Sequence, residues 1–193
     1  MIAPPILTNE EHRLAALHRT YLLDTPQEAA FDLITRLVAR LCGTKIAAIS
    51  LVDRDRQWFK SRYGFTLEET SRVISFCAHA IEDTELFEIP DASLDKRFWD
   101  NPLVVQAPKI RFYVGVPLYT ADGYCLGTLC AIDDRPQTLS DRQRHHLLGL
   151  AKQVERHIHW RTAFLAQYPD SQTLVSPKEA AHQGPHCSLS SVV

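Results

Sequence analysis

Residues Arg111–Asp134 read RFYVGVPLYTADGYCLGTLCAIDD and predict two β-strands joined by a tight turn. The first strand is expected over roughly 112–119 and the second over roughly 124–132. The Asp122-Gly123 pair between them is a strong hairpin signal, because glycine adopts a positive φ without steric strain. Pro117 has no N–H for the ladder, so we expect a bulge or an open side beside it. A hairpin this apolar needs further strands beside it and helices across one face.

The composition is typical of a globular domain. The chain has 193 residues, of which 45% are hydrophobic and 23% are charged, enough for one domain with a sizeable core. The net charge of -2 gives no general attraction to nucleic acid or to an anionic membrane. No apolar run approaches the ~18 residues of a membrane span, and the first residues lack the pattern of a signal peptide. We therefore expect a cytoplasmic protein that binds neither nucleic acid nor membrane.

The cysteines do not form a recognisable framework. There are five, an odd number, and no Cys-x-x-Cys spacing occurs. A disulfide scaffold and a cysteine-rich zinc site are both disfavoured by that pattern. Most of the thiols are expected to be buried and reduced. The five are Cys42, Cys77, Cys125, Cys130 and Cys187.

Two helices are predicted before the first strand. Asn9 is a suitable N-cap for a helix that extends to about residue 22. Thr25, followed by Pro26 and Glu28, has the pattern of a capping box with proline at the first helical position, so a second helix is expected to begin there. Gly43 is expected to stop that helix.

Two strands should follow, at 46–52 and 57–63, around a polar turn. Strict alternation places three side chains of the second strand on one face (Trp58, Lys60 and Arg62) and three on the other (Phe59, Ser61 and Tyr63). Lys60 is interpreted as a solvated strand residue, with a role in a pocket as the alternative.

The middle of the chain is less regular. We expect a loop at 64–72, a short helix at 73–81 and a short strand at 86–90. Residues 91–108 form a long connection with little periodicity, and such segments inside compact domains are often functional.

The final predicted element is a long helix. Ser140 and Gln143 form a capping box, and the apolar stripe that follows extends to about residue 164. We therefore expect an irregular leader at 1–8, one domain at 9–165 and a disordered tail at 166–193. Five strands without regular βαβ alternation predict an α+β fold with an antiparallel sheet of five to six strands, helices packed on one face and a long C-terminal helix.

Six ordered segments resemble the bacterial GAF domain. They are LLDTP (22–26), SLVDRDRQWFKSRYG (50–64), SFCAHAI (75–81), IPDAS with DKRFWDNPLV (89–104), IRFYVGVPL (110–118) and LGTLCAIDDRPQTLS (126–140). The resemblance covers roughly 9–162 and implies a PAS-like sheet of strand order 2-1-5-4-3, with helices on one face and a small-molecule pocket on the other. It also implies terminal helices that pair with a second subunit. Histidine kinases, diguanylate cyclases and phosphatases are the usual neighbours of such domains, although this chain carries no kinase or cyclase motif.

Cys77 and His79 are the first candidates for chemistry. Two residues apart on a helix, their side chains diverge by about 200° and do not face one another. A metal site would need further ligands, and none is apparent from spacing. We therefore predict no catalytic residue and no metal ligand, and expect His79 to be packed and hydrogen-bonded.

The cofactor is left unknown. In GAF domains that resemble phytochromes, a bilin is attached to a cysteine that precedes a histidine. Residues 103–108, the comparable region here, contain neither residue type. The signature of cyclic-nucleotide-binding GAF domains is not apparent either.

A related GAF group reduces free methionine sulfoxide with cysteines. Cys125 and Cys130 are five residues apart, so a regular strand would place them on opposite faces. A bulge at Gly127 would change that, and Cys77 could approach either of them in space. A small thiol-dependent reductase therefore stays open as an alternative.

The prediction is a small-molecule-sensing or regulatory module without a catalytic output domain of its own. Its candidate ligand contacts are Cys77, Asp91, Arg97, Phe112 and Tyr113. Phe112 and Tyr113 point to opposite faces, so only one can reach a given pocket. The expected partners are an unidentified small molecule, a second copy bound through the terminal helices, and a signalling kinase or cyclase. A ligand-free dimerisation scaffold is the remaining alternative.

Overall fold

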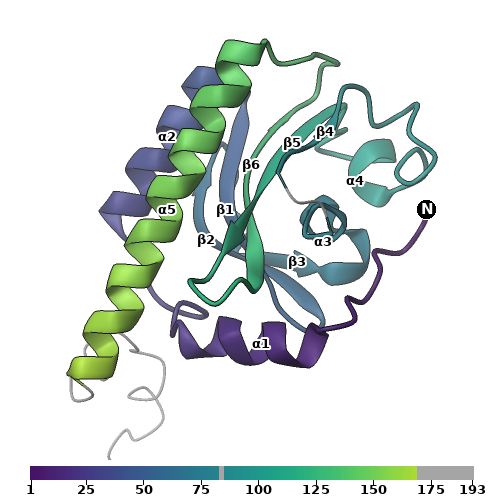
Figure 1. The fold of residues 1–193 in the computed structure, drawn as a ribbon. Helices are drawn as coiled ribbons and strands as arrows, with labels where there is room; N and C mark the ends of the chain where they lie inside the picture. The colour runs from purple at the N-terminus through teal and green to yellow at the C-terminus, as the bar shows by residue number, and fades with distance from the viewer. Residues whose placement is uncertain (83–84, 169–193) are drawn as a thin grey trace, which may run out of the picture.

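The computed structural model describes residues 1–82 and 85–168 (Figure 1). Its helices are α1 (Glu10–Arg19), α2 (Ala29–Cys42), α3 (Phe76–Ala80), α4 (Pro102–Val105) and α5 (Asp141–Gln167), with a short 3-10 helix at Arg72–Ile74. Its strands are β1 (Ile46–Val52), β2 (Arg56–Tyr63), β3 (Glu69–Ser71), β4 (Phe87–Ile89), β5 (Phe112–Tyr119) and β6 (Cys125–Asp133).

The strands form one antiparallel sheet in the order β3-β2-β1-β6-β5-β4. Without β3, this is the order that the resemblance implied, and the predicted α+β fold is confirmed. Strand β3 lies in the segment predicted to be a loop. It has only three residues, Glu69-Thr70-Ser71, and pairs with the start of β2. So short and polar a strand carries no apolar alternation that a sequence pattern could reveal.

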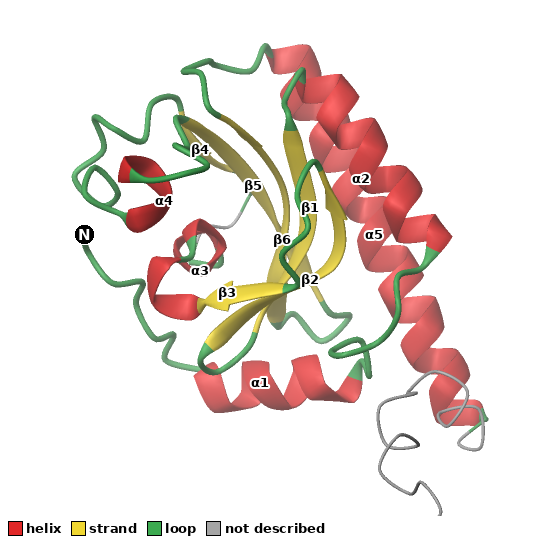
Figure 2. Cartoon of the chain, turned by 180° about the vertical axis from the view of Figure 1, so that it is seen from behind, coloured by secondary structure: helices red, strands yellow, loops and turns green. Residues whose placement is uncertain are grey.

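The sheet separates two layers of cover (Figures 1 and 2). Helices α2 and α5 lie side by side against one face, while α3, α4 and the irregular segments lie across the other, and α1 crosses one end. The helix-side core includes Phe31, Val38, Ile49, Leu51, Trp58, Phe112, Val114, Leu118, Leu129, Leu147, Val154 and Ile158. The cavity-side core includes Ala48, Val52, Phe59, Phe76, Cys77, Phe87, Ile89, Phe98, Tyr113 and Cys130.

The β5–β6 hairpin forms as predicted. Gly123 adopts a φ of 84°, and its N–H donates to the carbonyl oxygen of Thr120 at 3.0 Å, which closes the turn. Pro117 is accommodated by an open side, because β4 pairs with β5 only at residues 113–115.

A β-bulge in β2 overturns part of the predicted alternation. Ile49 pairs with Ser61 and Ser50 with Phe59, so Lys60 is the extra residue. Ser61 therefore does not share a face with Phe59. Its hydroxyl points toward α2, where it accepts from Thr35 at 2.7 Å.

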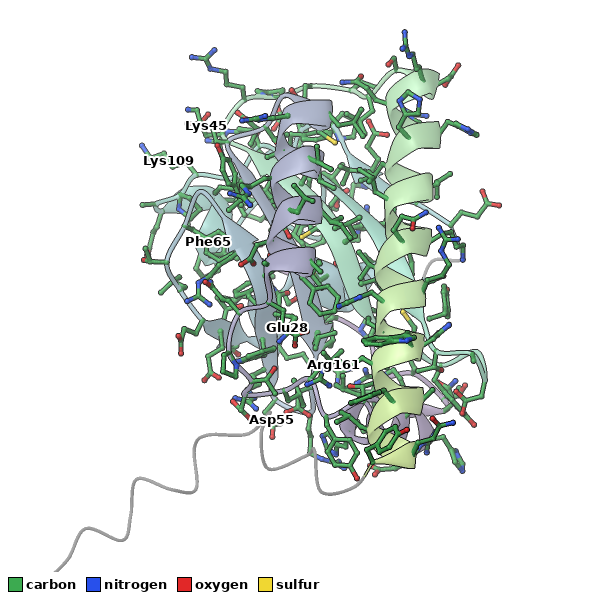
Figure 3. All side chains as sticks on the ribbon, turned by 90° about the vertical axis from the view of Figure 1, so that its left-hand side faces the viewer. Glu28, Lys45, Asp55, Phe65, Lys109 and Arg161 are labelled. Atoms are coloured by element: carbon green, nitrogen blue, oxygen red, sulfur yellow. The ribbon has the colours of Figure 1, made fainter. Side chains whose placement is uncertain are left out.

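Lys60 is not the solvated strand residue that was expected. Its side chain is fully buried on the helix side of the sheet. The Nζ atom donates to the Thr25 hydroxyl and to the Pro26 carbonyl oxygen, each at 2.7 Å. It also pairs with Glu28 at 2.7 Å, and Glu28 in turn lies 3.3 Å from Arg161. Figure 3 shows Glu28 and Arg161 between α2 and α5.

The predicted start of the second helix is wrong. Helix α2 begins at Ala29, and its N-cap Glu28 makes no side-chain capping bond. The Thr25 hydroxyl donates instead to the Leu22 carbonyl oxygen at 2.6 Å and accepts from Lys60. The buried ammonium group therefore occupies the oxygen that would have capped the helix. The stop at Gly43 is confirmed by its φ of 68°.

The long C-terminal helix has the predicted capping box at Ser140 and Gln143. It continues to Gln167, three residues past the predicted end, and its 27 residues span about 40 Å. The predicted tail lies almost wholly outside the described residues, as does Cys187. None of the helices in the described part of the chain is both long and apolar enough to cross a bilayer.

Candidate functional site

A cavity of about 330 Å³ opens on the face of the sheet opposite α2 and α5. The sheet forms its floor, and its walls come from the segments before β3, around α3 and between α4 and β5. It is lined by Ile46, Gln57, Phe59, Gly64, Phe65, Leu67, Thr70, Phe76, Cys77, Leu103, Ala107, Pro108, Ile110, Tyr113 and Ile132. The cavity thus lies on the face of the sheet opposite α2 and α5 (Figure 2), where the resemblance implied a small-molecule pocket.

Among residues 1–82 and 85–168, no charged side chain lines this cavity. The polar side chains in its wall are those of Gln57, Thr70, Cys77 and Tyr113. Gln57 already accepts a hydrogen bond from Ser75 through its side-chain oxygen. The Thr70 hydroxyl oxygen is buried and has no hydrogen-bond partner among the described residues. An unpaired buried hydroxyl is unfavourable. A bound molecule would remove that penalty only if the Thr70 side chain turned its hydroxyl toward the cavity.

Two thiols and a phenol meet at the floor. The Tyr113 hydroxyl donates to the sulfur of Cys77 at 3.2 Å, and the sulfurs of Cys77 and Cys130 are 3.9 Å apart. All three side chains are buried. The ring of Tyr113 lies over Gly115, two residues further along the same face of β5. It can do so because Gly115 has no side chain, since a Cβ there would collide with the phenol.

The environment shifts the pKa values of Cys77 and Cys130 in opposite directions. Burial raises the pKa of Cys77, but its polar contacts with Cys130, Thr128 and Tyr113 outweigh burial and hold it below its ordinary value. The pKa of Cys130 is raised by its contact with the Cys77 sulfur and by burial. Cys77 is therefore the sulfur that ionises first.

The other described cysteines are different. Cys42 lies on α2, and burial raises its pKa to about 12. Cys125 lies on β6, and burial raises its pKa to about 11. Cys125 belongs to the same cluster as Cys130 because β6 has a bulge opposite Leu118 and Tyr119, which reverses the predicted alternation.

Two of the five predicted contacts line the cavity. Tyr113 of β5 forms part of its floor, and Cys77 of α3 forms part of its wall. Phe112 points to the opposite face, into the helix-side core, as the alternation of adjacent residues requires.

The two predicted polar contacts, Asp91 and Arg97, are engaged elsewhere. Asp91 accepts from the backbone N–H and the hydroxyl of Ser93, at 3.0 and 2.6 Å. Arg97 pairs with Asp95 at 2.7 Å and packs over the ring of Phe87. Both are local structural interactions in the long connection, and neither side chain lines the cavity.

His79 also serves packing. Its Nε2 lies 3.1 Å from the carbonyl oxygen of Ile2, and its ring packs edge-on against Phe98 at 4.8 Å. His79 thus anchors the segment before α1 and does not face Cys77, in agreement with their spacing. Residues 1–82 and 85–168 contain no group of three or more His, Cys, Asp or Glu side chains that could hold a metal ion.

Several residues that line the cavity were not among the predicted ligand contacts. Gln57 could have been found, because it is two residues before Phe59 and so shares its face of β2. Thr70 could not, because its strand was not predicted. The remaining wall residues, Leu103 and Ile110 among them, lie in irregular segments whose positions depend on tertiary packing.

Comparisons with known proteins place the fold. A family model described as "GAF domain" matches residues 26–158. A protein of Pseudomonas aeruginosa named cyclic di-GMP phosphodiesterase PA2567 is 41% identical over 160 residues, which are 82% of this chain. The chain spans only 27% of the length of that relative.

Solved structures agree at lower identity. The GAF domain of an Acinetobacter phosphoenolpyruvate-protein phosphotransferase has a TM-score of 0.55 at 18% identity, covering 82% of this chain and 98% of that one. Free methionine-R-sulfoxide reductase from Neisseria meningitidis has a TM-score of 0.56 at 16% identity, covering 79% of this chain and 87% of that one. At such identities the likeness concerns the fold alone. The family match over residues 26–158 is decisive, and the chain belongs to the GAF domain family.

Proposed function

We propose that this GAF domain is a sensory or regulatory module that binds a neutral, largely apolar small molecule in the cavity. The observation that carries the proposal is the open cavity of about 330 Å³ without a charged lining residue. Its size falls within the ~300–1,000 Å³ range typical of small-molecule sites. An open cavity of this kind also favours ligand binding over a ligand-free scaffold.

The lining defines the chemistry of the ligand. A charged group would lose its hydration without gaining an ion pair, which is strongly unfavourable. A cyclic nucleotide or a free carboxylic acid therefore fits poorly. An aromatic or aliphatic body would pack on Phe65, Phe76 and Leu103, and one polar group would bond to the Thr70 hydroxyl.

The signalling context is inferred from the Pseudomonas relative. It is named a cyclic di-GMP phosphodiesterase, and the identity of 41% supports a role for this domain in regulating an enzyme of that kind. A signalling kinase or cyclase is the alternative partner. We propose that ligand binding acts on such a partner through α5 and its neighbour α2, with the domain in a homodimer.

Native mass spectrometry of the purified protein tests ligand binding directly. We expect a retained neutral molecule that dissociates on activation. Thr70→Val preserves shape and removes the unpaired hydroxyl, so affinity should fall by about tenfold, the effect of one lost hydrogen bond. The matched control is Thr66→Val, an exposed threonine in the adjoining loop that does not line the cavity. A bare protein that binds no neutral compound from a screened set would contradict the proposal.

A thiol-dependent reductase is the second candidate function. The 3.9 Å separation of the Cys77 and Cys130 sulfurs favours it. The uncharged cavity disfavours free methionine sulfoxide, because that substrate is a zwitterion. Turnover of methionine sulfoxide that Cys77→Ala and Cys130→Ala abolish, while Cys125→Ala retains it, would establish this function. Absence of turnover in the unaltered protein would eliminate it.

A further inference from the structure

We propose that Cys77 and Cys130 are a redox pair, which an apolar organic hydroperoxide entering the cavity oxidises to a disulfide. The inference concerns the same cavity as the proposed function, but it does not require a sensed ligand, because oxidation of the two thiols is measured without one. It rests on the separation of the sulfurs, the access of one of them to the cavity and the composition of the cavity wall.

The Cys77 and Cys130 sulfurs are close enough to form a disulfide after a small movement. The two sulfurs are 3.9 Å apart, and a disulfide of about 2.05 Å requires an approach of roughly 2 Å. Cys130 lies on β6, which is paired with β1 on one side and with β5 on the other, so its position is fixed. Cys77 lies on α3, a helix of only five residues, so a small shift of α3 would bring the sulfurs together.

The two thiols have different roles. Cys77 lines the cavity, and the Tyr113 hydroxyl donates a hydrogen bond to its sulfur at 3.2 Å. Such a donor stabilises a thiolate, which is the nucleophilic form. Cys130 does not line the cavity, and its thiol lies 3.6 Å from the carbonyl oxygen of Ala48. Cys77 is therefore the attacking thiol and Cys130 the resolving one.

The reaction proceeds in two balanced steps. The Cys77 thiolate attacks the terminal oxygen of the hydroperoxide and the O–O bond breaks, giving a sulfenic acid and an alkoxide that takes up the proton released by Cys77. Cys130 then attacks the sulfenic sulfur, the S–O bond breaks, and the hydroxide leaves as water with the Cys130 proton. In sum, two thiols and one hydroperoxide give one disulfide, one alcohol and one water.

The cavity wall selects the oxidant. Apart from Gln57, Thr70, Cys77 and Tyr113, its lining side chains are apolar, with Phe65, Phe76 and Leu103 among them. An apolar hydroperoxide gains the free energy of burying its hydrocarbon part next to the thiol. Hydrogen peroxide gains nothing comparable. Oxidation by cumene hydroperoxide should therefore be the faster reaction.

The experiment uses the full chain with Cys187→Ser, which removes the cysteine outside the described residues. The reduced protein is mixed with one equivalent of cumene hydroperoxide or hydrogen peroxide and followed by intact mass and peptide mapping. We expect the loss of two hydrogens, a Cys77–Cys130 cross-link and reversal by dithiothreitol. Cys130→Ser should stop at a sulfenic acid that dimedone traps at Cys77.

Two controls separate the pair from general thiol oxidation. Cys125→Ser and Cys42→Ser should oxidise as the parent protein does. Tyr113→Phe keeps the ring and removes the donor, so oxidation should slow by about tenfold. Thiols that do not react in the folded parent protein, or a cross-link that involves Cys125, would refute the proposal that Cys77 and Cys130 form a redox pair. A faster reaction with hydrogen peroxide would refute the proposal that the oxidant is apolar. These readouts need no bound ligand, so they stand apart from the test of ligand binding.

Discussion

At the scale of single residues, Gly115 determines the floor of the cavity. It leaves room for the phenol of Tyr113, and that phenol in turn donates to Cys77. The glycine is therefore required by the space above it rather than by its backbone conformation. The sequence showed a glycine in a strand, but only the fold shows which neighbour occupies the missing side chain's place.

Gly115→Ala should displace the Tyr113 ring and lower the free energy of unfolding by about 1–3 kcal/mol, the usual effect of overpacking a core. Urea unfolding measures the change. Gly149→Ala is the matched control, because a Cβ there meets nothing within 4 Å and the residue lies in the exposed part of α5. That control should raise stability by about 0.5–1 kcal/mol. Equal effects of the two substitutions would refute the steric argument.

A second residue-scale prediction concerns Glu10. Its carboxylate accepts from Arg13 at 2.7 Å and from Arg72 at 2.5 Å, and all three side chains are buried. Burial alone would raise the pKa of Glu10, but the two guanidinium groups lower it from 4.5 to about 2. The carboxylate thus links α1 to the segment that leads into α3.

Because the folded-state pKa of Glu10 is lowered, its contribution is fully present above pH 4.5 and is lost as the pH falls toward 2. The difference corresponds to about 3 kcal/mol. Glu10→Gln should lower stability at pH 7 and flatten the decline between those two pH values. Denaturant unfolding across that window measures it. If the acid limb kept its slope in the variant, Glu10 would not be its source.

At the scale of elements, the bulge in β2 is the feature that matters most. It turns Ser61 toward α2 and places Lys60 under the start of that helix. The buried ammonium group then requires Glu28, which also faces Arg161 of α5. One extra residue in a strand thereby connects the sheet with both large helices.

Glu28→Gln should lower stability by about 2 kcal/mol, somewhat less than for a fully buried pair because Glu28 is partly exposed. Lys60→Met should cost less in the Glu28→Gln background than alone, because it then removes an uncompensated buried charge. A double-mutant cycle by chemical unfolding measures the coupling. Strictly additive effects would show that the pair is not coupled.

The predictable elements are those whose signal is local. The hairpin turn at Gly123, the stop at Gly43 and the capping box at Ser140 depend on a few adjacent residues, and all three form as expected. Thr25 has an equally good local pattern but is engaged by Lys60, 35 residues away. A bulge also escapes sequence patterns, because it depends on the register of the neighbouring strand.

The candidate site was predictable in location but only partly in composition. The resemblance implied a pocket on the face of the sheet opposite the helices, and Cys77 and Tyr113 line the cavity there. Asp91 and Arg97 are polar candidates because they lie at the end of a strand and in the long connection, but both find partners within a few residues along the chain. Charged side chains in a polar connection satisfy one another locally, whereas the cavity behind them remains apolar.

At the scale of the whole molecule, α5 carries an exposed aromatic row. Trp160, Phe164 and Tyr168 follow one another at four-residue spacing, and successive rings lie 5.6 and 5.0 Å apart. Exposed apolar side chains on the adjoining α2, Leu33 and Leu37, add to the apolar surface of this helical layer. Apolar surface of this kind is typical of an interface between subunits.

We expect the protein to be a dimer that Trp160→Asp with Phe164→Asp converts to a monomer without loss of helix content. Light scattering coupled to size exclusion measures the mass, and circular dichroism the fold. Ala166→Asp is the control, because this exposed residue lies about 120° around the helix from Trp160. A dimer that survives the double substitution would place the interface elsewhere.

The separation of the helix-side core from the cavity-side core has an evolutionary consequence. Residues that contact only one of two distant clusters affect stability nearly independently. Substitutions that reshape the cavity therefore leave the packing of α2 and α5 on the sheet intact. The residues around the cavity are therefore free to change with the ligand while those of the helix-side core keep the fold.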